Sequence, residues 1–271
     1  MYGPDIPKTG VPFLMLGVHS FYKVTLLMLL VVTLSIIIYR FLRLLVKEGK
    51  IKKISIFIIT FLLMLLLFVL IKYENEAQIN NKIERSEDIL IEYKNTLNNI
   101  QNHKNLIKED ISNQHTSIEN AQLTEKKIYP KTGEVIGVIN IDQISLELPI
   151  IEDSNDKNLW LGASHIRGTP LYWEKGNSFL AAHRLRTYGK LFNRLHELNI
   201  GDEVTVSNPN DDFTYVVYDI EVISPDNKKC FTKNKGEYNL SLVTCTKNGK
   251  ERLVVYCRRI RKQIKSNRAS L

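Results

Sequence analysis

Two long apolar runs near the N-terminus constrain the fold of this chain more than any other feature of its sequence. Residues 24–39 form an uncharged run of sixteen, and residues 54–71 form one of eighteen. Peptide groups inside a bilayer must hydrogen-bond within their own segment, so runs of this length are expected to be membrane-spanning helices. The sequence therefore predicts a two-helix transmembrane hairpin over residues 23–72, in contact with the lipid bilayer. A pair of helices buried in a protein core is the alternative interpretation.

The charges around these runs predict their orientation. Between them lie six basic residues and a single acidic one: Arg40, Arg43, Lys47, Lys50, Lys52, Lys53 and Glu48. Basic loops stay in the cytoplasm, so the N-terminal segment 1–22 and everything after residue 72 are expected outside the cell membrane, which makes this a two-pass protein. A signal peptide fits less well, because its basic residues would precede the first apolar run.

The net charge of +8 does not indicate a nucleic-acid partner. Much of it lies in that short cluster and in residues 258–271, which hold six basic residues and no acidic one. The rest of the chain is slightly acidic, whereas a nucleic-acid-binding domain carries a basic face. Residues 261–271 are predicted to be a basic tail, either in contact with anionic wall polymer or lipid headgroups, or simply solvated.

Residues 73–129 contain neither Gly nor Pro and are rich in Glu, Lys, Asn and Gln. Two apolar rows recur there at intervals of seven or fourteen: Ile83, Leu90, Leu97, Ile111 and Ile118 in one, and Ile79, Tyr93, Ile100 and Ile107 in the other. Such rows form a narrow stripe on a helix, typical of a coiled-coil seam or a helical hairpin. We expect a helical stalk through which copies could self-associate; a solvated spacer is the alternative.

From residue 130 to residue 260 the pattern changes from helical to β. Short apolar runs separated by turn-forming sequences predict seven strands: 135–141, 146–151, 178–182, 203–206, 213–223, 240–244 and 252–256. A short helix is expected at 191–198. This mainly β domain of about 130 residues fits a closed or partly closed barrel, although the pattern alone does not separate a barrel from a sandwich.

Three residues in this domain could support thiol chemistry. Cys245 ends one predicted strand, Arg252 opens the next, and His183 follows the strand at 178–182. A nucleophilic thiol needs an imidazole as its acid–base partner, and a nearby cation stabilises an oxyanion. His165 is a rival for the imidazole role, and residue spacing does not choose between the two histidines. A strand-end cysteine can also be a small buried apolar residue with no reactive role.

Several ordered motifs in this domain resemble those of the sortase family, the cysteine transpeptidases of Gram-positive cell surfaces. Residues 241–246, SLVTCT, resemble the TLxTC signature, and Arg252 matches the family's arginine on the following strand. Residues 181–184, AAHR, resemble the (A/S)GHR segment, and residues 162–169, GASHIRGT, resemble GxGHxxGT. The opening strands resemble IGxIxIPxIxxxLPI. The sequence around the cysteine is most similar to the pilin-polymerising class C and the related class D.

This resemblance implies an eight-stranded sortase-type β-barrel and a site of Cys245, His183 and Arg252 at the cell surface. In such an enzyme the cysteine cleaves an LPxTG-like sorting signal between Thr and Gly through a thioester, and an amine then takes the acyl group. The implied partners are LPxTG-bearing surface proteins or pilins, with a wall precursor or a pilin lysine as the amine acceptor. His165, Thr244 and Ala182 are implied pocket residues, and this chemistry requires neither a metal nor a cofactor.

Ile6, Pro7, Lys8, Thr9 and Gly10 spell IPKTG, a sequence like a sorting signal, near the N-terminus. An apolar run and basic residues follow it, which is the layout of a sortase substrate. We hypothesise that the segment is a substrate in cis or a site of self-processing; a chance match is the alternative. The PKTG at residues 130–133 has no following apolar run and is interpreted as part of a linker.

Two other functions remain open from the sequence. The chain could be a membrane-anchored coiled-coil scaffold with a catalytically idle barrel, or a simple thiol protease that uses water as the acceptor. Cys230 and Cys257 could form a disulfide, although two free structural thiols are the favoured interpretation. No CxxC pair or Cys/His cluster indicates structural zinc.

Overall fold

The computed structural model describes residues 50–112, 129–233 and 237–260, together with residues 29, 33, 36, 37 and 40. The chain divides into two compact units, Pro12–Asn81 and a unit that comprises Lys82–Leu271 together with Met1–Val11. All the described strands and every predicted catalytic residue lie in the second unit.

One long helix, α2 (Lys50–Ser112), is present in the described residues. It continues through the second apolar run without a break, because no Gly or Pro interrupts the helical backbone between residues 50 and 112. Within the described ranges no helix is long and apolar enough to cross a membrane. The predicted two-helix transmembrane hairpin over residues 23–72 is therefore wrong. The run at 54–71 forms the first part of a longer helix, and the run at 24–39 lies almost wholly outside the described residues.

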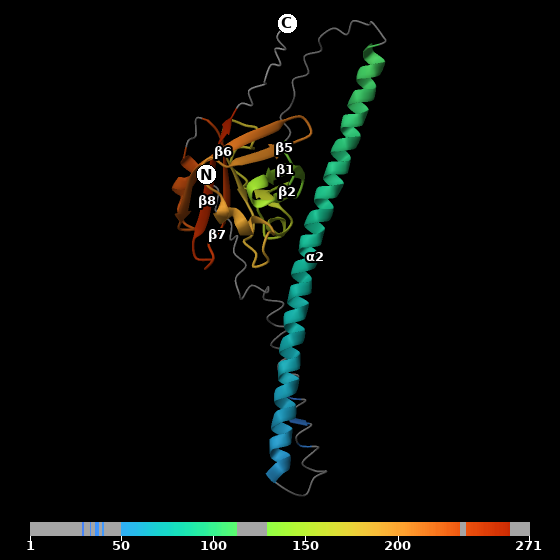
Figure 1. Ribbon diagram of the computed structural model, residues 1–271, viewed down its shortest axis with the longest axis vertical. Coiled ribbons are helices and arrows are strands. Elements are labelled where there is room, and N and C mark those ends of the chain that lie inside the picture. Colours follow the sequence, from blue (N-terminus) through green and yellow to red (C-terminus); the bar gives the residue numbers. More distant parts are fainter. Residues whose placement is uncertain are drawn as a thin grey trace. The chain divides into compact units, whose positions relative to one another are not determined.

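The described part of the second unit contains eight strands, which close into a barrel in the order β1-β2-β3-β4-β7-β8-β6-β5 (Figure 1). The strands are β1 (Val135–Ile141), β2 (Leu146–Glu152), β3 (Ala163–His165), β4 (Gly176–Ala181), β5 (Glu203–Ser207), β6 (Asp212–Ile223), β7 (Tyr238–Cys245) and β8 (Arg252–Ile260). Closure leaves no unpaired strand edge at the side of the sheet. The eight-stranded barrel is thus confirmed, and the sandwich alternative is excluded.

Short 3₁₀ helices connect some of these strands. In the described residues they are η1 (Asp142–Ile144), η2 (Asn158–Trp160), η3 (Phe192–Glu197) and η4 (Lys228–Thr232). The helix expected at 191–198 is η3, which has 3₁₀ rather than α-helical geometry. The sequence did not predict β3, because three residues are too few to show an alternating pattern.

Two strand pairings determine where the predicted catalytic residues lie. Strand β4 runs parallel to β7, with Ala181 opposite Val243. Strand β8 runs antiparallel to β7, with Arg252 opposite Cys245. Parallel strands end at the same side of a sheet, so the residues that follow β4 meet the end of β7 at one end of the barrel.

The barrel interior is filled by side chains from all around the sheet. Fully buried apolar residues on the inner face come from distant strands: Ile139, Ile150, Leu180, Val204, Leu242 and Val255. Buried tyrosines bond across this core, since the Tyr215 hydroxyl donates to the Tyr172 carbonyl oxygen at 2.5 Å and the Tyr172 hydroxyl donates to Ile136 at 2.6 Å. Because these hydroxyls are hydrogen-bonded, the tyrosines can be buried without the free-energy cost of an unpaired polar group.

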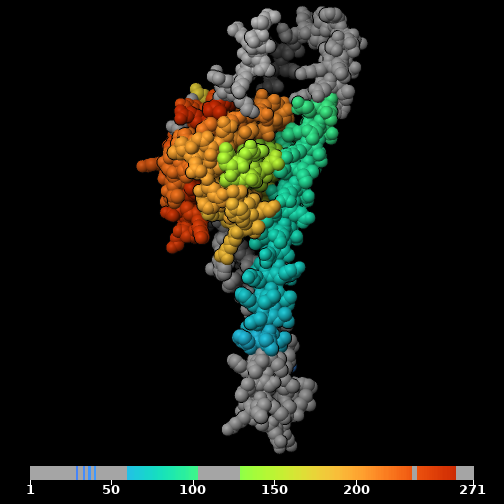
Figure 2. Space-filling view, in the orientation of Figure 1, coloured from blue at the N-terminus to red at the C-terminus, as the bar shows by residue number. Residues whose placement is uncertain are grey.

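The part of α2 that belongs to the second unit packs on the barrel. Its side chains Ile83 and Leu90 line a pocket together with Leu146 and Leu148 of β2. On the same face, Lys94 Nζ lies 2.5 Å from Glu147 Oε1. Figure 2 shows this teal and green stretch of the helix against the yellow-green surface of the β1–β2 hairpin. Residues of the predicted narrow stripe therefore face the barrel of their own chain here.

Candidate active site

Cys245 and Arg252 face each other at the end of the β7–β8 hairpin. They are the last residue of β7 and the first of β8, and their Cα atoms are register partners. The turn between them is closed by a hydrogen bond of 3.1 Å from the Thr246 amide to the Glu251 carbonyl oxygen. Gly249 takes φ +73° in this turn, a left-handed conformation that side chains disfavour. The hairpin therefore holds the thiol and the guanidinium on neighbouring strands.

His183 reaches the same place from β4. The pairing of β4 with β7 continues past Ala181, because the Ala182 amide donates to the Val243 carbonyl oxygen at 3.2 Å. The Thr244 hydroxyl in turn donates to the Ala182 carbonyl oxygen at 2.9 Å. Counting one further residue along each chain places His183 beside Cys245. Side chains at matching positions of paired strands lie on the same side of the sheet, so we expect the imidazole and the thiol to lie close together.

All three of these side chains are largely withdrawn from solvent. Cys245 is 2% exposed, His183 5% and Arg252 4%. The guanidinium is fixed by its own hairpin, since Arg252 Nη1 donates to the carbonyl oxygens of Glu251 at 3.2 Å and Gly249 at 3.4 Å. A positioned cation in a water-poor site stabilises a developing oxyanion far better than it would in bulk water.

Thr244 and Ala182, the predicted pocket residues, are fully buried beneath this site. The hydrogen bond between them ties β7 to the residue that precedes His183, and their pocket role stays a prediction. Their small side chains let the two backbones approach closely at the strand ends. We therefore assign them a supporting position between the thiol and the imidazole.

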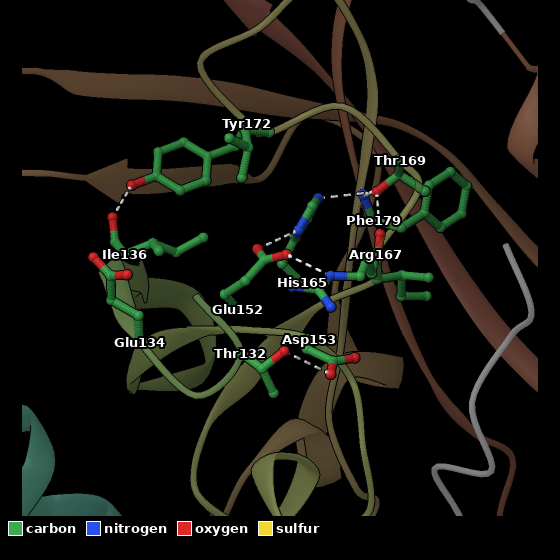
Figure 3. Close-up of polar contacts among 12 residues, drawn as sticks. Thr132, Glu134, Ile136, Glu152, Asp153, His165, Arg167, Thr169, Tyr172 and Phe179 are labelled. Atoms are coloured by element: carbon green, nitrogen blue, oxygen red, sulfur yellow. Dashed lines mark hydrogen bonds and ion pairs between the residues drawn. The ribbon is translucent and has the colours of Figure 1, made fainter. Parts of the chain in front are cut away.

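His165, the rival histidine, occupies a different buried site. Its Nδ1 lies 2.7 Å from Glu152 Oε2, and its Nε2 lies 3.0 Å from the Thr169 hydroxyl and 3.1 Å from the Pro170 carbonyl oxygen. Figure 3 shows the ring between Glu152 and Thr169, with Arg167 Nε 3.7 Å from the other carboxylate oxygen. Both ring nitrogens are engaged at the β2–β3–β4 junction. His183, unlike His165, follows the end of β4 and comes directly after the residue that Thr244 bonds.

The other two cysteines are free thiols inside the protein. Both Cys230 and Cys257 are buried, and neither is in a disulfide. Burial raises the pKa of Cys230 to about 11 and raises that of Cys257 far above its usual value. Thiols in such surroundings stay protonated and unreactive near neutral pH. The disulfide between Cys230 and Cys257 is thus absent, and both residues are buried free thiols, as the favoured interpretation of the sequence predicts.

Two residues that contact the predicted histidines carried no signal in the sequence. Trp160, at the end of η2, places its ring centroid 4.7 Å from that of His183. Glu152 pairs with His165 because β2 and β3 are parallel and adjacent. Both contacts join segments that are distant along the chain, so only the strand register reveals them. Within the described ranges, no three His, Cys, Asp or Glu side chains are grouped as metal ligands would be.

Two sequence predictions fall where no structure is described. The IPKTG segment, Ile6–Gly10, lies outside the described residues, and so does the basic tail at 261–271. Their proposed roles stay predictions.

Comparison with known proteins gives a consistent family match. Residues 139–260 match the model of the Sortase domain family. Sortase A of Bacillus anthracis is 32% identical over 140 residues, which cover 51% of this chain and 62% of that protein. Sortase D of Bacillus subtilis (strain 168) is 28% identical over 136 residues, which cover 48% of this chain and 67% of that protein. The chain thus spans just under two thirds of the length of the first of these relatives.

A solved structure extends the match to the fold. The structure of a Clostridium perfringens Sortase D5 transpeptidase has a TM-score of 0.51 and 26% sequence identity, and the match covers 66% of this chain and 99% of that chain. The matched family region begins within β1 and ends with β8, so it contains Cys245, His183 and Arg252.

Proposed function

We propose that the protein, whose residues 139–260 match the Sortase domain family, is a cysteine transpeptidase acting on LPxTG-like sorting signals. The proposal is supported by the strand register, which sets Arg252 opposite Cys245 and joins the residue before Cys245 to the residue before His183. Cys245 is the nucleophile, His183 the general acid and base, and Arg252 the oxyanion partner. A thiol, an imidazole and a fixed cation are the groups that acyl transfer through a thioester needs.

The first half-reaction breaks the Thr–Gly peptide bond. The Cys245 thiolate attacks the threonine carbonyl carbon, and the negative charge that develops on the carbonyl oxygen is stabilised by Arg252. The C–N bond then breaks as the His183 imidazolium gives its proton to the leaving glycine nitrogen. The products are a thioester at Cys245, a neutral imidazole and a free amine.

The second half-reaction resolves the thioester. An acceptor amine attacks the thioester carbon, His183 takes the proton from the attacking nitrogen, and Cys245 leaves as a thiolate. A new amide bond replaces the one that was broken, so transfer needs no external energy source. With water as the attacking group, the same site would act as a thiol protease.

The substrates follow from this chemistry. We propose LPxTG-bearing surface proteins or pilins as acyl donors, and a wall precursor or a pilin lysine as the amine. Such partners are found on the outer face of Gram-positive cells, so we propose that the catalytic domain is extracytoplasmic. The Ile6–Gly10 segment is proposed as a donor in cis, because it has the Pro-x-Thr-Gly core of such a signal.

A peptide panel tests the proposal with the full chain. Fluorogenic peptides with LPxTG, IPKTG and scrambled cores are incubated with and without an amine acceptor, and products are identified by mass. We expect Thr–Gly cleavage of LPxTG, and ligated product when amine is present, both abolished by Cys245→Ala and retained by Cys257→Ala. Cleavage that yields only free acid with every amine would favour the protease, and no cleavage by folded enzyme would favour the idle-barrel scaffold.

A further inference from the structure

Trp160 is held in place beside His183 by its own short helix. The Asn158 side chain, buried in η2, donates to the carbonyl oxygens of Glu152 at 3.1 Å and Asp153 at 2.8 Å. The next residue, Leu159, is fully buried in the core. These anchors leave the indole of Trp160 half-buried, so it does not serve to fill the core. The buried residues Asn158 and Leu159 fix the backbone position of Trp160, while its ring faces the candidate active site.

The indole contacts the His183 imidazole directly. The two ring centroids are 4.7 Å apart, with the planes inclined at 57°. Aromatic pairs at this separation attract each other, and an indole also attracts an imidazolium through its π electrons. The contact therefore stabilises one orientation of the imidazole in both protonation states. His183 needs that orientation, because it must reach both the thiol and the leaving nitrogen.

The same indole is contacted by α2. Lys82 Nζ lies 4.1 Å from the centroid of the Trp160 ring, and burial lowers the pKa of Lys82. One turn further along α2, Glu87 Oε1 lies 2.5 Å from Lys190 Nζ. Lys190 lies in the segment that follows His183, where the Phe192 amide donates to the His183 carbonyl oxygen at 3.2 Å. The helix thus contacts the aromatic partner of His183 and the Lys190 side chain of the segment that follows His183.

We propose that Trp160 is a positioning residue for His183 and that the packed part of α2, through Lys82, adjusts how Trp160 holds the imidazole. This inference rests on the proposed function, in which His183 moves the proton. It gives α2 a role in the chemistry of the barrel. A displacement of about 1 Å in a reacting group can lower a rate by up to about a hundredfold, so loss of the ring contact is expected to be measurable.

Fluorescence of the full chain tests the ring contact without any substrate. The protein has two tryptophans, so Trp173→Phe leaves Trp160 as the only emitter. A protonated imidazole quenches an indole that it touches, so Trp160 emission should rise in one step as pH rises. We expect the step to vanish in Trp173→Phe combined with His183→Asn, and to be absent in Trp160→Phe, which retains only Trp173. A step that survives His183→Asn, or no step with Trp160 present, would overturn the contact.

Kinetics then separate positioning from a structural role. In Trp160→Leu we expect kcat for peptide cleavage to fall about tenfold, with KM nearly unchanged and the pH dependence of kcat displaced. Trp160→Phe, which keeps an aromatic face, should recover most of that loss, and Trp173→Phe is the matched control. Equal kcat values and pH profiles in Trp160→Leu and the wild type would overturn the positioning role. If the wild type cleaves no peptide, the proposed function fails while the fluorescence result still stands.

The role of α2 is tested with two lysines on the same helix. Lys82→Gln removes a positive charge next to the indole, so the His183-dependent step should move to higher pH. Lys94→Gln removes an ion pair to Glu147 that does not touch Trp160, and should leave the step in place. Equal midpoints in Lys82→Gln and Lys94→Gln would show that α2 does not act on His183 through Trp160.

Discussion

The hydroxyl of Thr244 donates a 2.9 Å hydrogen bond to the carbonyl oxygen of Ala182, and so joins the residue before Cys245 to the residue before His183. Both residues are fully buried, so this bond has no competition from water. It lies where the parallel pairing of β4 and β7 ends. Thr244 thus joins the two strand ends that carry the proposed nucleophile and its proposed acid–base partner.

Thr244→Val should weaken both stability and catalysis. The substitution keeps the side-chain shape but leaves a buried carbonyl oxygen without this donor, which costs about 1–3 kcal/mol. Because the strand ends loosen together, kcat should fall as well. Denaturant unfolding and steady-state peptide cleavage measure the two effects. Thr232→Val, which removes an exposed hydrogen bond to Lys229, is the control and should change stability by less than about 0.5 kcal/mol. Equal effects of the two substitutions would contradict this account.

His165→Asn and His183→Asn should have opposite consequences. His165 is paired with the buried Glu152 carboxylate, and removing one partner of a buried pair costs about 3–5 kcal/mol. Asn restores one donor, so we expect a smaller loss of stability and a cleavage rate close to that of the wild type. His183→Asn should stay as stable as the wild type but lose about a hundredfold or more in rate. A large loss of rate in folded His165→Asn, with His183→Asn active, would reverse the assignment.

Arg252→Lys should not replace arginine. The guanidinium is planar and presents several donors in a rigid fork, and here Nη1 is fixed on two hairpin carbonyl oxygens, an arrangement that an ammonium group does not reproduce. We expect kcat/KM to fall about a hundredfold in Arg252→Lys and at least as far in Arg252→Ala, in line with loss of an oxyanion donor. Arg258→Lys, an exposed position on the same strand, is the matched control. Full activity in Arg252→Lys would show that any cation suffices.

The free energy of unfolding should decrease as pH rises from about 9 to 12. Burial and then the nearby Glu134 raise the pKa of Tyr93 to about 12, burial raises that of Cys230 to about 11, and burial raises that of Tyr172 further. The unfolded chain loses these protons first, so the folded state binds more protons and its stability falls by up to about 1.4 kcal/mol per pH unit for each group. Denaturant titrations at pH 8, 10 and 11 measure this slope.

The control for that slope is a pair of tyrosines. Tyr172→Phe removes a buried hydroxyl and should make the decrease with pH shallower. Tyr188→Phe removes an exposed one and should leave the slope as in the wild type. A stability that is constant or rises over this range would contradict the buried positions of these groups.

The positions of Cys245 and Arg252 at strand ends were predictable from the sequence, because each lies at one end of an apolar run. Cys245 closes one such run and Arg252 opens the next, so their pairing follows from a short hairpin. His183 could be placed beside them only through family motifs, since the parallel pairing of β4 with β7 joins segments about sixty residues apart. Trp160 lies in a connection and Glu152 at a strand end, neither within a motif, and their contacts with His183 and His165 depend on the tertiary structure.

The transmembrane hairpin is a prediction that a clear local pattern suggested and the structure overturned. An apolar run indicates a segment suited to apolar surroundings, but it does not show where the helix that contains it begins or ends. In the structure α2 continues from the apolar run into the polar stretch up to Ser112, and part of that stretch packs on the barrel. The heptad-like stripe favours a seam between helices, yet two of its residues, Ile83 and Leu90, line a pocket with Leu146 and Leu148 of β2. The same spacing suits any apolar surface, so periodicity alone does not name the partner.

The most direct test of the central claim is the intact mass of the enzyme during turnover with an LPxTG peptide and no amine. We predict an adduct whose mass equals that of the peptide fragment ending at threonine, and peptide mapping should locate it on Cys245. The adduct should form only slowly in His183→Asn. Added amine should release it as ligated product. An adduct on Cys230 or Cys257, or turnover of the peptide by Cys245→Ala, would contradict the account.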